Sequence, residues 1–97
     1  MTVYSVAQIR IKDRSEYDLY AAQFMDVFAK FKGTVLAADF EPKAVIGEWD
    51  ADRLVLLSFP DEAAFAEWAT SEEYKEIAKH RIAGADLTSW LAKGIDA

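Results

Sequence analysis

Segment 53–59 carries the most informative pattern of apolar residues in this chain. Both of its alternating faces are apolar, which is typical of a strand buried on two sides. One face carries Leu54 and Leu56, and the other carries Val55, Leu57 and Phe59. The helices of a small domain cover only one face of a sheet, so the second apolar face predicts a partner. We expect that partner to be a second copy of the chain.

Residues 3–11 alternate with a period of two and predict the first strand. One face of this strand carries Val3, Ser5, Ala7, Ile9 and Ile11, and the other carries Tyr4, Val6, Gln8 and Arg10. If the second face lines a cavity between two subunits, its polar residues stand among apolar walls, which is the usual composition of a small-molecule pocket. A strand end whose arginine reaches solvent explains the same pattern equally well.

A helix and a second strand follow. Apolar residues recur at spacings of four and three through residues 17–31, which predicts an amphipathic helix. Asp13 is the expected N-cap, with Ser15 as a competitor, and Gly33 is expected to end the helix as a left-handed C-cap. A strand at about 34–40 comes next, and the helical crossover between the two strands predicts that they run parallel.

Segment 53–59 is also expected to form a hairpin with the residues before it. The sequence Glu-Pro-Lys at 41–43 interrupts the preceding strand, because proline cannot donate a ladder hydrogen bond. Residues 44–49 then predict a short further strand. The sequence Asp-Ala-Asp at 50–52 supplies the turn that joins this short strand to segment 53–59.

The C-terminal third predicts two helices and a closing strand. Asp61 is the expected N-cap of the first helix, and Thr70 or Ser71 that of the second. Gly84 ends or loosens the second helix, and residues 87–91 predict the closing strand. The order of all these elements predicts an α+β domain of the ferredoxin-like kind, in which helices cover one face of a sheet.

Composition limits the class of protein. The 97 residues are expected to form a single domain, residues 1–97, and 53% of them are apolar, enough for a packed core. No apolar run approaches the roughly 18 residues that a membrane helix needs, so no membrane partner is expected. The chain has no cysteine, which excludes disulfides and thiolate zinc sites, and we expect a cytoplasmic protein.

The charge balance argues against nucleic acid as a partner. The formal net charge is −6, and the 11 basic residues are scattered among 17 acidic ones. Neutralising phosphates needs clusters of Lys and Arg, which this distribution does not supply. We interpret the acidity as a solubility feature. A small anionic ligand stays compatible with it, because one buried arginine acts locally.

The sequence offers little for acid–base or metal chemistry. His80, the one histidine, falls on the polar face of its helix beside Glu76 and is expected to be a solvated surface residue. One histidine, no cysteine and dispersed carboxylates give no cluster of metal ligands, so we expect neither a metal nor another cofactor. The sequence has no glycine-rich phosphate loop and no nucleophile motif such as Gly-x-Ser-x-Gly.

Arg81 and Trp90 are further candidates for ligand binding. Arg81 stands seven residues after Tyr74, so its stem lies on or beside the apolar stripe of its helix. A guanidinium there needs a carboxylate, carbonyl groups or a bound anion. An ion pair that ties the helix to a strand end or to the other subunit is favoured over a ligand. Trp90 alternates with Leu87, Ser89 and Leu91, so if those leucines face the helices, Trp90 lies on the dimer side near the face that carries Tyr4. The candidate ligand-binding residues are therefore Tyr4, Gln8, Arg10, Arg81 and Trp90.

The central block of the chain has a distinctive order of residues. It reads Gly47-x-Trp49-x-x-x-Arg53-Leu-Val-x-x-x-Phe59-Pro60, followed by Trp68-x-x-Ser71-x-x-Tyr74 and then Arg81. This block resembles the DUF1330 family of small dimeric α/β-barrel proteins, and the resemblance extends over nearly the whole chain. It implies a ferredoxin-like protomer whose open sheet face packs against a second copy. It implies no activity and no catalytic residue, because none is established for the family.

Two positions depart from the pattern of the family. Lys32-Gly33 stands where relatives often have paired glycines, and Ile46 stands where they usually have a glutamate. Glu48 follows two residues later. In a strand this shift keeps the same face but moves the side chain about 6–7 Å along it. Chemistry in relatives that needs that carboxylate therefore does not carry over directly to this chain.

Three functional classes are compatible with the sequence. The first is a homodimer that binds a small apolar or aromatic metabolite in its barrel. The second is an enzyme similar to the cofactor-independent monooxygenases and isomerases built on dimeric α/β barrels, and the third is a structural homodimer without a ligand. A pocket on the scale of a small ligand favours the first two. A titratable group with a perturbed pKa inside it favours the enzyme.

Overall fold

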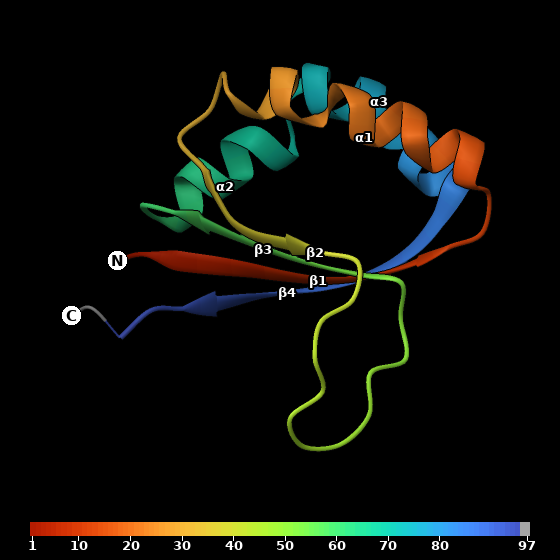
Figure 1. The fold of residues 1–97 in the computed structure, drawn as a ribbon. Helices are drawn as coiled ribbons and strands as arrows, with labels where there is room; N and C mark the ends of the chain where they lie inside the picture. The colour runs from red at the N-terminus through yellow and green to blue at the C-terminus, as the bar shows by residue number, and fades with distance from the viewer. Residues whose placement is uncertain (96–97) are drawn as a thin grey trace.

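The computed structural model describes residues 1–95, and these residues form a four-stranded antiparallel sheet with three helices packed on one face (Figure 1). The strands lie in the order β2-β3-β1-β4. No helix in this part of the chain is both long and apolar enough to cross a membrane. The predicted α+β, ferredoxin-like fold is confirmed. The elements are β1 Val3–Ile11, α1 Arg14–Phe28, β2 Thr34–Asp39, β3 Arg53–Phe59, α2 Glu62–Ala69, α3 Glu72–Gly84 and β4 Ala85–Lys93.

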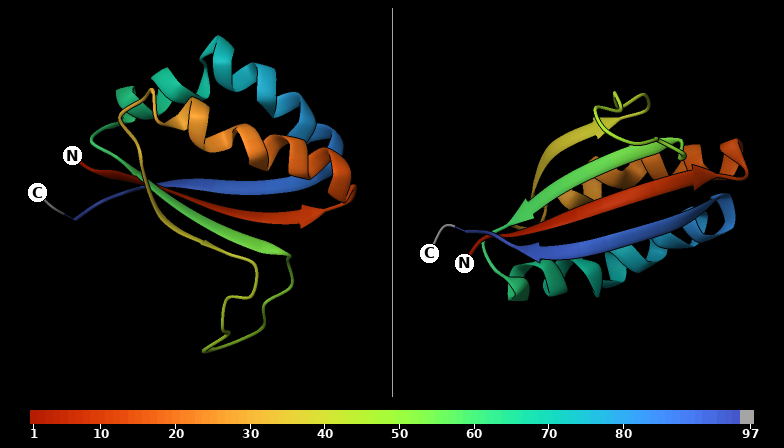
Figure 2. Two further views of the ribbon diagram at one scale, coloured as in Figure 1. Left: turned by 45° about the horizontal axis from the view of Figure 1, so that its top comes forward. Right: turned by 90° about the horizontal axis from the view of Figure 1, so that it is seen from below.

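The helices leave one face of the sheet uncovered, which we call the open face (Figure 2). On β1 the odd-numbered residues from Val3 to Ile9 are buried. Val3 and Ile9 each belong to one of the two apolar clusters that the helices form with the sheet. The even-numbered residues point the other way. There Val6 stands opposite Leu56 of β3 on one side and Trp90 of β4 on the other. The open face therefore carries neighbouring apolar side chains, in agreement with the two-sided pattern of segment 53–59.

Strand β3 lies between β1 and β2. Because β3 is antiparallel to both, β1 and β2 run parallel as predicted, although they are not neighbours. Both edges of β3 are thereby occupied, so the predicted strand at 44–49 has no β3 edge to pair with. That prediction is wrong, and residues 40–52 form an irregular loop on the side of the sheet away from the helices (Figure 1). Asp52 anchors the loop: its carboxylate accepts from the Ile11 amide at 2.7 Å, and its own amide donates to the Ile9 carbonyl at 2.8 Å.

Side-chain caps begin the three helices at the predicted positions. The Asp13 carboxylate accepts from the amides two and three residues further on, at 3.1 and 3.3 Å. The Asp61 carboxylate and the Ser71 hydroxyl each accept from the amide three residues further on, at 2.8 and 3.1 Å. Asp13 rather than Ser15, and Ser71 rather than Thr70, is thus the N-cap. The Ser15 hydroxyl instead donates to Asp13 and lowers the pKa of that carboxyl.

Gly33 does not have the predicted C-cap role. Helix α1 ends at Phe28 with Ala29 as its C-cap, and among the described glycines only Gly47 has a positive φ, 86°. Gly33 is required by space instead. A Cβ at this position would stand 2.7 Å from Cε1 of Phe59 and closer still to the ring of Phe28. The backbone therefore approaches the core too closely for any larger residue to fit without a shift.

The core between sheet and helices is largely aromatic. One cluster of buried side chains contains Phe28, Phe59 and Trp68, with ring centroids 5.3 Å apart for Phe28 and Trp68 and 5.5 Å apart for Phe59 and Trp68. A second cluster contains Tyr17 and Tyr20 together with aliphatic residues of β1 and α3. These large rings hold the helical layer on the sheet.

Candidate functional site

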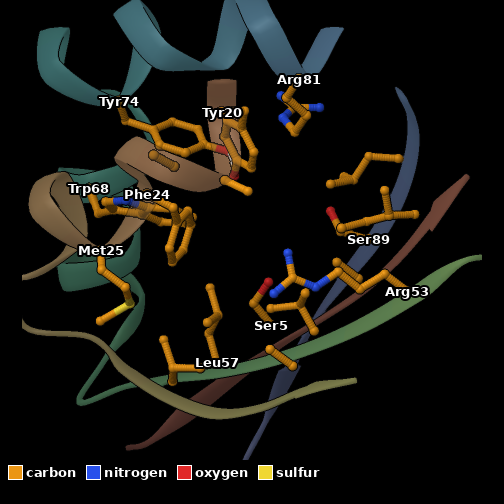
Figure 3. A pocket seen from close by; sticks show the side chains of 18 of the residues that line it. Ser5, Tyr20, Phe24, Met25, Arg53, Leu57, Trp68, Tyr74, Arg81 and Ser89 are labelled. Carbon is orange, nitrogen blue, oxygen red and sulfur yellow. Dashed lines mark hydrogen bonds between the residues drawn. The ribbon is translucent and has the colours of Figure 1, made fainter. Parts of the chain in front are cut away.

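A cavity of about 460 Å³, which we call the pocket, lies between the sheet and its helices (Figure 3). The helix-facing side of the sheet contributes Ser5, Leu57 and Ser89, and all three helices contribute further side chains. Ligand sites in proteins are typically about 300–1,000 Å³, mostly apolar and equipped with a few polar groups. In size and composition the pocket matches a site for a small molecule.

Aromatic side chains from three helices form one wall of the pocket. Phe24 comes from α1, Trp68 from α2 and Tyr74 from α3 (Figure 3). The ring centroid of Trp68 lies 4.4 Å from that of Tyr74 and 6.1 Å from that of Phe24. We call these three residues the aromatic wall. Its rings suit a flat apolar or aromatic ligand, because aromatic pairs gain energy from offset and edge-on contacts.

Two tyrosines share a hydrogen bond beside the aromatic wall. The hydroxyl oxygens of Tyr20 and Tyr74 are 3.0 Å apart. Burial and the neighbouring Tyr74 raise the pKa of Tyr20 above its ordinary value. A phenol with a raised pKa stays protonated at neutral pH, so Tyr20 contributes a neutral hydrogen-bonding group and not a general base.

Arg53 points into the pocket from the start of β3 (Figure 3). Its Nη1 donates to the Tyr17 hydroxyl at 2.9 Å, and the Phe40 ring centroid lies 4.6 Å from its guanidinium carbon. Its Nε is buried and has no acceptor within residues 1–95. No carboxylate in this range forms an ion pair with it. The contacts orient the guanidinium without neutralising its charge.

Arg81 reaches the pocket from α3, on the wall across from Arg53 (Figure 3). The expected internal ion pair is missing from the described part of this protomer, because no carboxylate there pairs with Arg81. Its Nε is buried without an acceptor in the same range. The charge of Arg81 acts on Tyr20, where it partly offsets the rise in the pKa of that tyrosine. The guanidinium therefore faces the pocket as an uncompensated cation.

The structure separates Arg81 from the other predicted ligand-binding residues. Arg81 lines the pocket, whereas the other four lie on the open face of the sheet and do not line it. Arg10 is exposed and forms an ion pair with Asp50 at 2.7 Å. Trp90 is 52% exposed. Ligand binding at the open face thus stays a prediction for these four residues, Tyr4, Gln8, Arg10 and Trp90.

Sequence reasoning did not select Arg53, Tyr17 or Tyr20 as pocket residues. For Arg53 the signal was present, because it stands two residues before Val55 and four before Leu57, and alternating residues share a face. Once these two are assigned to the helix-facing side, Arg53 follows. The tyrosines belong to the apolar stripe of α1. The spacing of that stripe does not show that their hydroxyl groups meet other polar groups at the pocket.

His80 lies outside the pocket and is not the solvated residue that was predicted. Its Nδ1 is 2.8 Å from Oε2 of Glu16, so the pair joins α3 to α1, and the His80 side chain is 26% exposed. Among the residues that the structure describes, no group of three or more His, Cys, Asp and Glu side chains is placed to hold a metal ion. The described lining of the pocket contains neither histidine nor carboxylate, and its polar groups are guanidinium, hydroxyl and indole groups.

The sheet order, the helices on one face and the pocket between the two layers define a ferredoxin-like α+β protein with a partly open pocket between its layers. The family model described as a domain of unknown function, DUF1330, matches residues 2–95. The chain therefore belongs to the DUF1330 family, as the resemblance of its central block predicts. No protein with a curated description matches the sequence significantly.

Several solved structures share this fold. A protein of unknown function from Rhodopseudomonas palustris is 21% identical with a TM-score of 0.81, over 99% of this chain and 84% of that one. A dimeric ferredoxin-like protein of unknown function from Jannaschia sp. CCS1 is 12% identical with a TM-score of 0.75, over 97% and 100%. SnoaB, a cofactor-independent oxygenase from Streptomyces nogalater, is 14% identical with a TM-score of 0.70, over 99% and 95%. At these identities the likeness shows the fold alone.

Proposed function

We propose that this protein is a homodimer that binds a small apolar or aromatic metabolite in the pocket between the sheet and the helices. The observation that carries the proposal is the pocket itself, about 460 Å³ in volume with the aromatic wall on one side. A concave and mostly apolar hollow of this size, with a few polar groups, is the usual form of a small-molecule site. A cavity of this size in a 97-residue chain is therefore best explained by a ligand that fills it.

The open face of the sheet supports the homodimer. Val6, Leu56 and Trp90 are neighbours across three strands there, and Trp90 is 52% exposed. The loop between β2 and β3 extends on the same side, and its Val45 and Ile46 are 88% and 96% exposed (Figure 1). A second copy on this face removes these side chains from water. A protein of the same fold, the one from Jannaschia, is described as dimeric.

Native mass spectrometry of the purified protein tests both parts of this proposal. We expect a dimer of the 10.9 kDa chain that retains additional mass. The retained mass should be lost in a Trp68→Ala variant of the aromatic wall and kept in a Trp90→Ala variant of the open face. A monomer contradicts the homodimer. A dimer that retains no mass, and binds no aromatic compound when one is added, contradicts the ligand and leaves a structural homodimer.

A cofactor-independent monooxygenase or isomerase is the second candidate function. It is favoured by the fold shared with SnoaB, which is described as a cofactor-independent oxygenase. Incubating the protein with its retained ligand, in air and without oxygen, separates this candidate from a binding protein. Oxygen uptake with a change in the mass of the ligand indicates an oxygenase, and a new product of unchanged mass indicates an isomerase. An unchanged ligand under both conditions indicates binding alone.

A further inference from the structure

Two cations face the pocket, and no acidic side chain of the described chain lines it. Arg53 enters from β3 and Arg81 from α3 (Figure 3). Both are partly buried, and neither has a carboxylate partner within residues 1–95. A charge removed from water without a counter-charge is costly, and two like charges on one cavity repel. An anion bound between the two guanidinium groups relieves both costs.

The pocket also has more hydrogen-bond donors than acceptors. Three buried nitrogen atoms have no acceptor in the described chain: Nε of Arg53, Nε of Arg81 and Nε1 of Trp68. Arginine and the indole group only donate hydrogen bonds, so none of the three can satisfy another. Buried N–H groups without acceptors are rare in folded proteins because each one lowers stability. These three atoms have almost no accessible surface, so a ligand in the pocket reaches the other N–H groups of Arg53 and Arg81. A group with oxygen acceptors and negative charge complements those N–H groups.

Arg53 is oriented in advance for such a contact. The hydrogen bond from its Nη1 to Tyr17 is 2.9 Å long, and the ring of Phe40 lies against the guanidinium at 4.6 Å. Both partners are neutral, so they hold the guanidinium plane while its full charge is kept. A planar guanidinium binds a planar carboxylate through two parallel hydrogen bonds.

We propose, resting on the function proposed above, that the ligand is an aromatic carboxylic acid. Its carboxylate binds between Arg53 and Arg81, and its ring packs against the aromatic wall. The predominantly apolar lining selects the ring, and the two guanidinium groups select the charge. A carboxylate is favoured over a phosphate, because phosphate sites commonly use glycine-rich backbone cradles and no glycine lines this pocket among the described residues.

Titration of the wild-type protein with a matched pair of probes tests this inference. The probes are 2-naphthoate and 2-naphthamide, which share a ring system and differ in charge, and calorimetry measures both affinities. We expect 2-naphthoate to bind about tenfold more tightly or better, as charge-assisted hydrogen bonds predict. Equal affinities overturn the inference and leave the binding function standing, whereas binding of neither probe overturns both. Tighter binding of 2-naphthyl phosphate than of 2-naphthoate overturns the assignment of a carboxylate.

Variants locate the charge that the probe recognises. Arg53→Gln and Arg81→Gln should each lower the affinity for 2-naphthoate about tenfold and leave that for 2-naphthamide unchanged. Arg10→Gln, the matched change on the open face, should alter neither affinity. An effect of Arg10→Gln alone contradicts the pocket as the site. If a glutamine variant fails to fold, Arg81→Lys replaces it, because lysine keeps the positive charge but loses the planar fork of the guanidinium. The titrations of the wild-type protein with the two probes test the inference without any variant.

Discussion

Replacing Gly33 by alanine tests how closely the chain approaches its aromatic core. The added Cβ would stand 2.7 Å from Cε1 of Phe59 and closer to the ring of Phe28. These rings are 1% and 2% exposed and pack at 5.8 Å between centroids, so neither has space to retreat. Overpacking costs about 1–3 kcal/mol, and alanine recovers about 0.4–1 kcal/mol by restricting the unfolded chain. We expect a net loss of roughly 1–2 kcal/mol in the free energy of unfolding.

Urea unfolding at one fixed protein concentration measures this loss, since the stability of a dimer depends on concentration. Gly33→Asn separates the close approach from a left-handed C-cap. A C-cap position tolerates asparagine better than alanine, whereas a steric limit makes the larger asparagine the more destabilising change. Lys32→Ala, at the exposed neighbouring residue, is the control and should leave the midpoint unchanged. A stable Gly33→Ala, or an asparagine variant more stable than the alanine one, refutes the steric explanation.

Three other substitutions test the pocket and the open face. Arg81→Met should raise the urea midpoint of the ligand-free protein, because it removes a partly buried charge that has no partner in the described chain. A lower midpoint would identify Arg81 as a residue that stabilises the fold. Leu56→Asp should give a folded monomer in light scattering because it places a charge on the open face, and a dimeric variant would exclude that face from the interface. Tyr20→Phe should lower stability by about 1 kcal/mol through loss of the bond to Tyr74. Because the pKa of Tyr20 is raised in the folded protein, Tyr20 contributes stability below pH 10.0, its ordinary pKa, and this contribution falls as the pH rises above that value. The Tyr20→Phe variant should therefore lose less stability than the wild type at high pH. An unchanged pH profile of stability would contradict the burial of the Tyr20 hydroxyl.

The strands and helices were largely predictable because local spacing sets which residues are buried. The two-sided pattern of 53–59 and the caps at Asp13 and Asp61 each need only a few neighbouring residues to be recognised. The strand at 44–49 was not predictable in this way. Pairing depends on which strand edges are free, and both edges of β3 are already taken, by β2 and β1. The same holds for β4, which is longer than the predicted 87–91 because it pairs with β1 along its whole length.

The candidate site was predictable only in part. Helical spacing placed Arg81 beside an apolar stripe, and the structure places it at the pocket. The alternation within one strand shows which residues share a face. It does not show which face lies toward the helices, because that depends on the relative register of all four strands. Tyr4 and Trp90 were therefore grouped correctly on one face, but the pocket lies on the other. The role of Gly33 likewise depends on rings that only the tertiary fold brings next to it.

Nuclear magnetic resonance of the tryptophan indole groups tests most directly whether a small molecule binds between the sheet and the helices. The three tryptophans report on three places, since Trp68 lines the pocket, Trp90 lies on the open face and Trp49 belongs to the loop between β2 and β3. Single Trp→Phe variants assign the three indole N–H signals. We predict that 2-naphthoate shifts the signal of Trp68 and leaves that of Trp90 in place. A shift confined to Trp90 would put the ligand on the open face and contradict the account.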